Sequence, residues 1–411
     1  MKDYSRIAKK TTWVLFANQS LASAGFIAAA TINSILGAQL GGSDYWTGVP
    51  SAVYLLGAAF AALAWGVVFD RIGRRKSIVS GLLIGMIGTA LALYAIWISS
   101  LALFLTGMLL MGITNAAVML GRFAAAEVSP PEQRGKAIST VVWGGTFGAI
   151  FGPLLVAPMG RFVTMFGMNE LAGSYLAVLV LFGIASVIVA IGLRPDPREI
   201  GREVADLYPE STPHGETRPV REILRQPAAL TAVVTMVLGQ VVMVALMVVT
   251  SRHMNHHQHG LTDISHVIQA HTIGMYAFSV VTGYLSDKWG RGQVIVSGAA
   301  MLLLACILAP LSPDVVPLAV ALFFLGLGWN FTFVGGSALL ADQLSPAERS
   351  RTQGTNDLMV GLASAMGSLG SGIIFAATSY TVIAAFAGAL SLIPLVMALM
   401  LMRRKVSPVV A

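Results

Sequence analysis

Long apolar runs alternate with short polar segments along almost the whole chain, and this alternation determines the class of fold. Runs of about 20 apolar residues suffice to cross ~30 Å of hydrocarbon as a helix, and they recur throughout the sequence. The pattern predicts twelve helical spans, at roughly 12–37, 46–69, 77–97, 100–123, 137–158, 172–193, 228–251, 264–286, 293–311, 316–341, 354–377 and 380–402. We therefore expect an all-α integral membrane protein with twelve transmembrane helices.

The regular spacing of the spans is interrupted once, by residues 194–227. This segment contains six prolines and charges of both signs, which is typical of a linker outside the membrane. We expect an N-terminal six-helix bundle over 1–193, a cytoplasmic linker over 194–227 and a C-terminal six-helix bundle over 228–411. Within the linker, Ile200, Val204 and Leu207 share one helical face, which predicts a short helix lying along the membrane surface.

Composition supports a membrane protein and excludes an ordinary soluble domain. The 411 residues are 56% hydrophobic and only 11% charged, whereas a soluble domain carries about 25% charged residues. The formal net charge of +7 suggests nucleic acid as a partner, but the basic residues follow the membrane topology instead. No nucleic-acid partner is therefore expected.

Lysine and arginine set the orientation of the spans. With the N-terminus inside, 24 of the 26 Lys and Arg residues fall in cytoplasmic segments, and only Arg161 and Arg252 fall outside. This asymmetry predicts an even number of spans with both termini in the cytoplasm. The first apolar run continues for about 25 residues without a clear cleavage site, so we expect a retained span rather than a signal peptide.

Two sequence signatures occur twice. GVVFDRIGRRK at 66–76 matches GYLSDKWGRG at 283–292 with an offset of 217 residues, and EVSPPEQRGK matches DQLSPAERSR with an offset of 216. Two separate signatures at nearly one offset indicate that the chain contains two homologous halves.

The repeated loop resembles the signature loop of the major facilitator superfamily, and the resemblance covers essentially the whole chain. It implies two pseudo-symmetric six-helix bundles around a central cavity, which open to each side of the membrane in turn. The loop residues that carry the resemblance are Gly66, Asp70, Arg71, Gly73, Arg74, Gly283, Asp287, Gly290 and Arg291.

The residue types in this loop also have a direct physical interpretation. Gly66 and Gly73 allow close packing and a tight turn, while Asp70, Arg71 and Arg74 can form ion pairs that hold the cytoplasmic side closed. The alternative is that the charges only anchor the loop in water.

Six of the seven histidines lie between Met243 and Met275, where two methionine pairings also occur. Met243 and Met247 are four residues apart, so their thioethers lie on one helical face, and His271 and Met275 repeat the spacing in the next span. Thioether sulfur and imidazole nitrogen suit a soft ion such as Cu(I) and bring no charge into an apolar interior.

This MxxxM and HxxxM pair resembles the CcoA-type copper importers, a branch of the same superfamily. The resemblance implies copper import by a bacterial inner-membrane protein, with Met243, Met247, His271 and Met275 binding the metal. Each methionine, taken alone, is better explained by packing. His271 alone could be a proton carrier or a hydrogen-bond donor to a neighbouring helix.

Two further sets of residues are candidates for roles around this site. An outer cluster, His253, Met254, His256, His257 and His259, would concentrate metal at the entrance or form an ordinary solvated loop. Asp357 is a candidate coupling carboxylate, although a position near the cytoplasmic boundary also fits an anchoring role.

Other functions leave weaker signals. GAIFGP at 148–153 resembles the end of the antiporter motif of drug exporters but lacks the glycine pair that follows it, so the alternative is a proton-coupled exporter of small organic compounds. A non-transporting metal sensor is a further alternative. No phosphate-binding loop, HExxH, CxxC or nucleophile-elbow motif occurs, which predicts a chain that is not an enzyme and needs no cofactor. The expected partners are copper or another small solute and the lipid bilayer, and we expect the protein to function as a monomer.

Overall fold

The computed structural model describes residues 4–207 and 218–403, and all the regular structure in these two ranges is helical. The prediction of an all-α fold is therefore confirmed. The described residues divide into two compact units, one formed by 4–42 and 49–207 and the other by 43–48 and 218–403.

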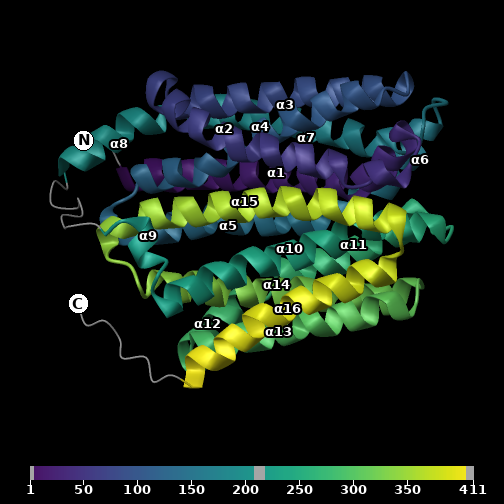
Figure 1. Cartoon of the computed structure of the whole chain (residues 1–411). Coiled ribbons are helices and arrows are strands. Elements are labelled where there is room, and N and C mark those ends of the chain that lie inside the picture. Colours follow the sequence, from purple (N-terminus) through teal and green to yellow (C-terminus); the bar gives the residue numbers. More distant parts are fainter. Residues whose placement is uncertain (1–3, 208–217, 404–411) are drawn as a thin grey trace. The chain divides into compact units, whose positions relative to one another are not determined.

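Unit 1 is built from long helices that run side by side, with the short helices at their ends (Figure 1). The end of the unit that carries α8 is opposite the end that carries α6 (Figure 1). The elements are α1 (Tyr4–Gly41), α2 (Val49–Ile72), α3 (Arg74–Trp97), α4 (Leu101–Glu127), η2 (Pro131–Gln133), α5 (Arg134–Phe151), η3 (Pro153–Leu155), α6 (Val156–Thr164), α7 (Ala172–Gly192) and α8 (Pro197–Leu207).

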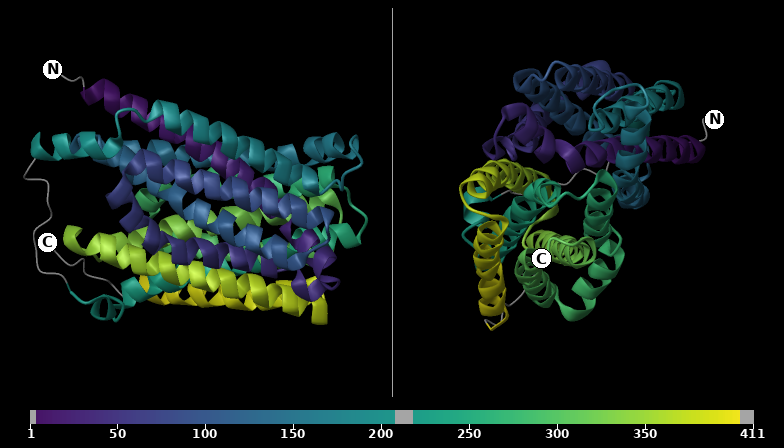
Figure 2. Two further views of the ribbon diagram at one scale, coloured as in Figure 1. Left: turned by 90° about the horizontal axis from the view of Figure 1, so that it is seen from above. Right: turned by 90° about the vertical axis from the view of Figure 1, so that its right-hand side faces the viewer.

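Unit 2 repeats this arrangement of long, nearly parallel helices, which are seen almost end-on in the right-hand view of Figure 2. It also includes the short segment 43–48 from between α1 and α2. The elements are η1 (Asp44–Trp46), α9 (Val220–Ile223), α10 (Pro227–His256), α11 (Leu261–Tyr276), α12 (Ser279–Trp289), α13 (Arg291–Leu308), η5 (Ala309–Leu311), α14 (Val315–Ala341), α15 (Pro346–Ala377) and α16 (Tyr380–Arg403).

The twelve predicted spans do not all form single long helices. Among the described residues, ten segments are helical, long enough and apolar enough to cross a membrane, and α2 is an eleventh if its 49° bend is accepted within one span. The remaining predicted span, 264–286, is divided into α11 and α12, so the expectation of one continuous helix there was wrong.

Asn330 of α14 compensates the break between α11 and α12. Its Nδ2 donates to the Met275 carbonyl at 2.7 Å and to Ser279 Oγ at 2.8 Å, and its Oδ1 accepts from Thr282 Oγ1 at 2.6 Å. Asn330 is buried, and a helix break at this depth is tolerated only when the freed polar groups find partners in the protein. One amide therefore joins the two half-helices to α14.

Glycine faces allow neighbouring helices to approach at backbone distance. A Cβ atom added at Gly144 of α5 would lie 2.5 Å from the Phe16 carbonyl oxygen of α1. One added at Gly152, directly after α5, would lie 2.6 Å from the Ala24 carbonyl oxygen of the same helix. Such spacing of small residues is the usual means of close helix packing in membranes, where no hydrophobic effect drives helices together. Helix α5 ends at Phe151, and the short helix η3 begins at Pro153.

The linker helix α8 forms as predicted, but its apolar face packs on protein. Ile200 and Val204 are buried against Ala8 of α1 and Val128, which follows α4, and Gly201 packs closely on Glu127. The expectation that this face lies on the membrane surface was therefore wrong, because the first unit itself covers it. The side chain of Leu207 and the linker residues 208–217 lie outside the described part of the chain.

In unit 2, the segment before α9 is fixed to the start of α15 by a buried carboxylate. Arg218 donates from Nε and Nη2 to the two Glu348 oxygens at 2.7 and 2.8 Å, and Glu348 closes a capping box with Ser345. Glu348 precedes the apolar span, which begins at Arg351, and the Arg218 guanidinium lowers its pKa well below the usual range.

The role of Asn330 can be tested by substitution. Asn330→Ala removes three hydrogen bonds, each worth about 0.6 kcal/mol inside a membrane protein, so we expect it to lower the unfolding free energy by about 2 kcal/mol. Thr282→Val removes only one of the three and should have a smaller effect. The thermal unfolding midpoint of the purified protein in detergent measures both, and equal midpoints for Asn330→Ala and wild type would exclude this role.

Candidate functional site

The predicted methionine and histidine ligands lie on α10 and α11 of unit 2. Met243, Met275 and His271 are buried, and Met247 is partly buried. Helix α11 packs on α14 with almost no space between the backbones, because a side chain at Gly326 would overlap the His271 carbonyl. The face of α11 that carries His271 is thus held against α14.

The imidazole of His271 has one engaged and one free nitrogen. Nδ1 lies 3.0 Å from the carbonyl oxygen of Leu322 on α14, and a carbonyl only accepts, so Nδ1 carries the proton. Nε2 is buried and has no hydrogen-bond partner among the described residues. In the neutral ring this atom keeps its lone pair, which is the arrangement usual for a histidine that binds a metal while its other nitrogen bonds a carbonyl.

The outer histidines face different partners and do not converge. The rings of His253 and His257 lie 4.7 Å apart, and His253 also stacks on Tyr380 at 4.2 Å. Met254 is buried. Within the described ranges, no group of three or more His, Cys, Asp or Glu side chains is arranged to hold a metal ion.

Carboxylates occupy the two other outer histidines. His256 Nε2 lies 3.3 Å from Asp44 Oδ2, and His259 Nδ1 lies 3.7 Å from Asp263 Oδ2. Asp44 of η1 also accepts from Arg252 at 2.8 Å. These contacts hold segment 43–48 and the end of α10 together within unit 2.

Three aromatic side chains and one amide lie together in unit 2, and we call them the Trp329 cluster: Tyr276, Trp329, Phe333 and Gln240. The Trp329 and Phe333 rings stack at 5.0 Å, and Tyr276 meets Trp329 edge-on at 6.0 Å. All four side chains are partly exposed. They come from α11, α14 and α10, so residues far apart in the sequence form one cluster of aromatic rings.

Gln240 fixes the indole ring of Trp329. The indole Nε1 donates to Gln240 Oε1 at 2.6 Å, and because an indole nitrogen only donates, the amide oxygen must face it. The amide nitrogen of Gln240 therefore points away, with two N–H donors that no described residue uses. Neither Gln240 nor Trp329 was identified as a site residue from the sequence, although Trp329 stands next to Asn330, a polar residue in the middle of an apolar span.

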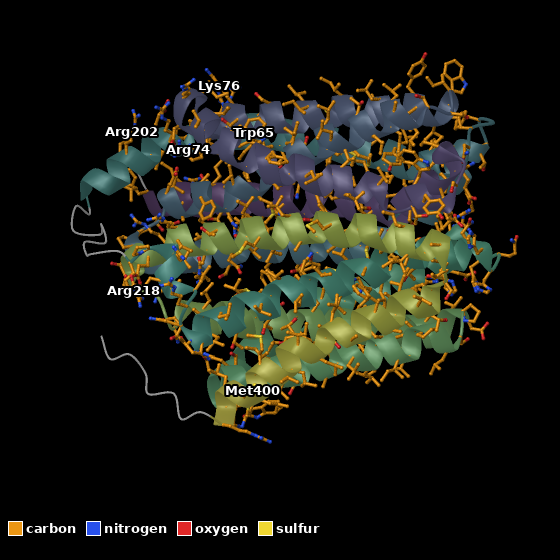
Figure 3. The ribbon with its side chains drawn as sticks, in the orientation of Figure 1. Trp65, Arg74, Lys76, Arg202, Arg218 and Met400 are labelled. Atoms are coloured by element: carbon orange, nitrogen blue, oxygen red, sulfur yellow. The ribbon has the colours of Figure 1, made fainter. Side chains whose placement is uncertain are left out.

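The signature loop of unit 1 forms a charge network around Arg74. Its guanidinium binds both Glu127 oxygens, at 2.8 and 2.7 Å, and Asp70 at 3.1 Å. Gly73 has φ +89°, so the predicted tight turn is present. Arg74, Lys76 and Arg202 lie at one end of the unit (Figure 3).

Two details of the loop differ from expectation. A Cβ atom added at Gly66 or Gly283 would meet no described atom within 4 Å, so neither glycine is needed for close packing. The Arg71 side chain pairs with no carboxylate in the described part of the chain, and its ion-pairing role passes to Arg74.

Unit 2 repeats the network in a more exposed form. Gly290 has φ +98°, and Arg291 binds Asp287 and, at 3.1 Å, Asp342. The Arg291 side chain is 26% exposed against 14% for Arg74. The duplication read from the sequence is thus repeated in the contacts.

A family model described as Major Facilitator Superfamily matches residues 15–266 and 232–410. The chain belongs to the major facilitator superfamily. This superfamily consists of transporters and not enzymes, so the chain is a multi-pass membrane transporter of small solutes.

Relatives of this transporter cover nearly its whole length. It is 36% identical to the uncharacterized MFS-type transporter YdeG of Bacillus subtilis, over 94% of this chain and 90% of that one. It is 30% identical to the riboflavin transporter RfnT of Brucella anthropi, over 86% of each. The nucleoside transporter NupG has the same fold, with a TM-score of 0.69 at 15% identity over 97% of this chain and 100% of that one.

One predicted residue of this superfamily member lies apart from the groups above. Asp357 is exposed in the first half of α15. Its neighbour Asn356 is buried, with Nδ2 at 3.6 Å from the Met236 sulfur. The coupling role assigned to Asp357 remains a prediction.

The two networks should differ in energetic weight. Arg74→Lys removes the two-pronged contact with Glu127 from a nearly buried site, and we expect a loss of about 1–3 kcal/mol of stability. Arg291→Lys, at the more exposed copy, should cost less. Thermal unfolding midpoints in detergent test this order; equal losses would mean that exposure does not set the strength of these networks.

Proposed function

We propose that this transporter carries a small organic solute with a flat heteroaromatic group. The Trp329 cluster supports this proposal, because it offers a partly exposed aromatic surface next to two unused amide N–H donors of Gln240. Solute sites are mostly apolar with a few well-placed polar groups, and stacked rings gain about 0.5–1.5 kcal/mol beyond burial. The riboflavin transporter among its relatives supports the same class of solute.

We propose that transport occurs across a bacterial inner membrane, with both termini in the cytoplasm. Relatives from two bacteria support a bacterial membrane. The placement of 24 of the 26 Lys and Arg residues in cytoplasmic segments supports the orientation. Asp357 is the proposed coupling carboxylate, and the transporter is proposed to act as a monomer.

Proteoliposomes containing the purified protein test the solute class, with riboflavin as the first probe and flux measured in both directions. Trp329→Leu should raise the KM about tenfold, since it removes the stacking surface. Trp329→Phe keeps a ring but loses the bond to Gln240 and should lie in between. Trp97→Leu, at a tryptophan 79% exposed, is the matched control and should leave transport unchanged.

Either of two results would contradict this proposal. If the wild-type protein moves neither riboflavin nor any other flat heteroaromatic solute, or if Trp329→Leu behaves like Trp97→Leu, the cluster does not form the solute site.

Copper import through Met243, Met247, His271 and Met275 is the second candidate. The observation in its favour is the buried Nε2 of His271, which keeps a lone pair while Nδ1 is held by Leu322. Met243 and Met275 of the MxxxM and HxxxM pattern are both buried, and their thioethers are the soft donors that Cu(I) prefers. The resemblance to the CcoA-type importers supports the same cargo.

Two substitutions at His271 separate metal binding from helix packing. His271→Asn retains a donor for the Leu322 carbonyl but removes Nε2, so the protein should fold while cellular copper accumulation falls to the level without the gene. Met247→Ala should do the same, whereas Met366→Ala, at a methionine 72% exposed, should not. Unchanged copper accumulation in both His271→Asn and Met247→Ala would exclude this cargo.

A further inference from the structure

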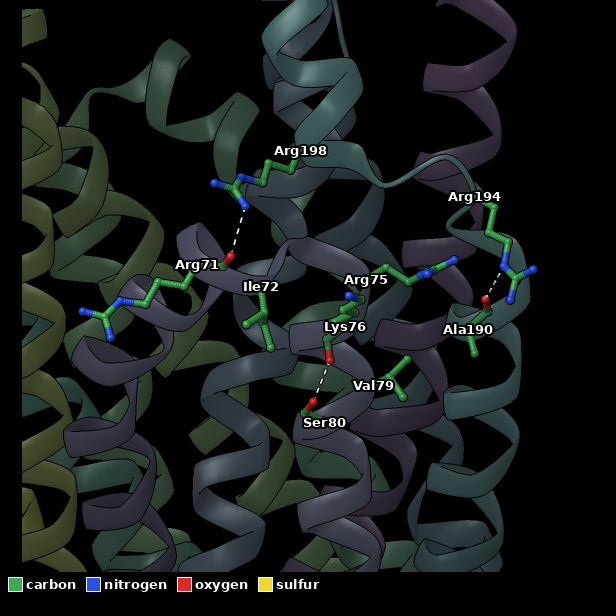
Figure 4. Close-up of a pocket in the computed structure, with 9 residues that line it drawn as sticks. All are labelled: Arg71, Ile72, Arg75, Lys76, Val79, Ser80, Ala190, Arg194 and Arg198. Atoms are coloured by element: carbon green, nitrogen blue, oxygen red, sulfur yellow. Dashed lines mark hydrogen bonds between the residues drawn. The ribbon is translucent and has the colours of Figure 1, made fainter.

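A basic pocket lies at the end of unit 1 where α2 passes into α3 and where the chain leaves α7 for α8 (Figure 4). It has a volume of about 720 Å³. Five basic residues line it, Arg71, Arg75, Lys76, Arg194 and Arg198, and no acidic residue does. The pocket belongs to unit 1 alone and is separate from the proposed solute and copper sites of unit 2.

The five cations have no anionic partner among the described residues. Arg198 Nη1 donates to the Arg71 carbonyl at 3.1 Å, and Arg194 Nε donates to the Ala190 carbonyl at 3.2 Å. The adjacent Arg74, by contrast, takes both Asp70 and Glu127. Asp70 and Glu127 are therefore already engaged by Arg74, and the pocket itself is lined by five basic residues and by no acidic one.

Asp196 builds the pocket without neutralising it. Its carboxylate accepts from three backbone N–H groups, those of Arg74 and Arg75 at 3.1 Å and that of Arg198 at 3.0 Å. It thus joins the first turns of α3 and α8 and brings their cations side by side. A neighbouring hollow shares Arg75, Lys76 and Arg198 and contains Asp196 and Glu199.

The remaining lining is mostly aliphatic. Ile72, Val79 and Ala190 contribute apolar surface, and Ser80 is the one further polar residue of the lining. The pocket lies at the first turn of α3 and just after the last turn of α7, both of which are apolar enough to cross a membrane. Cationic and aliphatic surfaces therefore meet at the level where headgroups of a bilayer meet acyl chains.

We propose that this pocket binds the phosphodiester headgroup of an anionic phospholipid such as cardiolipin. Several unpaired cations match the two phosphodiesters of that headgroup, and the aliphatic lining matches its acyl chains. Basic pockets between membrane helices on the cytoplasmic side are suited to such headgroups. Topology alone requires positive residues on this side but does not require that they converge on one cavity. The site is independent of which solute is transported.

Native mass spectrometry of the full-length protein, purified in detergent and titrated with cardiolipin, tests the proposal. Arg75→Gln with Lys76→Gln removes two side chains that make no hydrogen bond or ion pair with a described residue, and should weaken cardiolipin binding about tenfold or more. Arg221→Gln with Arg225→Gln removes the same charge from exposed residues beside α9 and should leave binding within about twofold of wild type.

Three results would overturn the proposal. The first is equal weakening by both double variants, which would indicate general attraction to the basic surface. The second is displacement of cardiolipin by a large excess of inorganic phosphate, which would indicate a site for a free anion. The third is equal binding of diacylglycerol, which has no phosphate. Unchanged thermal unfolding midpoints establish that each variant is folded.

Discussion

A peptide group that leaves water for hydrocarbon must find its hydrogen-bond partner within the protein, and this constraint governs both units. It makes every described element a helix, and it leaves helix association to backbone proximity and buried polar contacts. Gly144 of α5 and Gly152 directly after it allow α5 to lie on α1 at backbone distance, and Gly326 does the same for α11 on α14. Where the helical ladder is broken, at Tyr276–Ser279, Asn330 supplies the missing partners.

The sequence allowed the helices and the duplication to be predicted, because both depend on local patterns. Apolar runs of fixed length located nearly every long helix, and the loop repeated at an offset of 217 residues anticipated the matching networks of Arg74 and Arg291. The break in 264–286 was not predictable in this way, since all its residues are compatible with a helix. It depends on Asn330, which lies far along the chain.

The site was predictable only in part for the same reason. His271 was identified because an ionisable residue in an apolar span is unusual, but its carbonyl partner belongs to Leu322, whose side chain gives no signal. The Trp329 cluster combines residues of three helices, and no spacing within one segment indicates it. The amphipathic pattern of α8 was recognised correctly, but a pattern does not distinguish a lipid surface from the protein surface that Val128 provides.

The two charged regions at the basic end of unit 1 follow opposite rules. Around Arg74, the opposite charges are matched by Asp70 and Glu127, so the loop is internally neutralised. A few residues away, Arg75 and Lys76 line a cavity that contains no acidic residue, while Asp196 beside it accepts from backbone amides and Glu199 lines the neighbouring hollow. The first arrangement stabilises the fold, whereas the second leaves charge available to a ligand.

The division of the span 264–286 into α11 and α12 makes this region depend on one side chain of another helix. Asn330 is hydrogen-bonded to Met275 in the last turn of α11 and to Ser279 and Thr282 in the first turn of α12, so one side chain connects the two half-helices. Helix α11 carries His271, and α12 carries Asp287 of the repeated loop. Among the described residues, the helical ladder of hydrogen bonds is interrupted between α11 and α12, so the two half-helices are joined by the backbone and by the Asn330 amide. Loss of that amide would leave the Met275 carbonyl and the Ser279 and Thr282 hydroxyls each with one hydrogen-bond partner fewer.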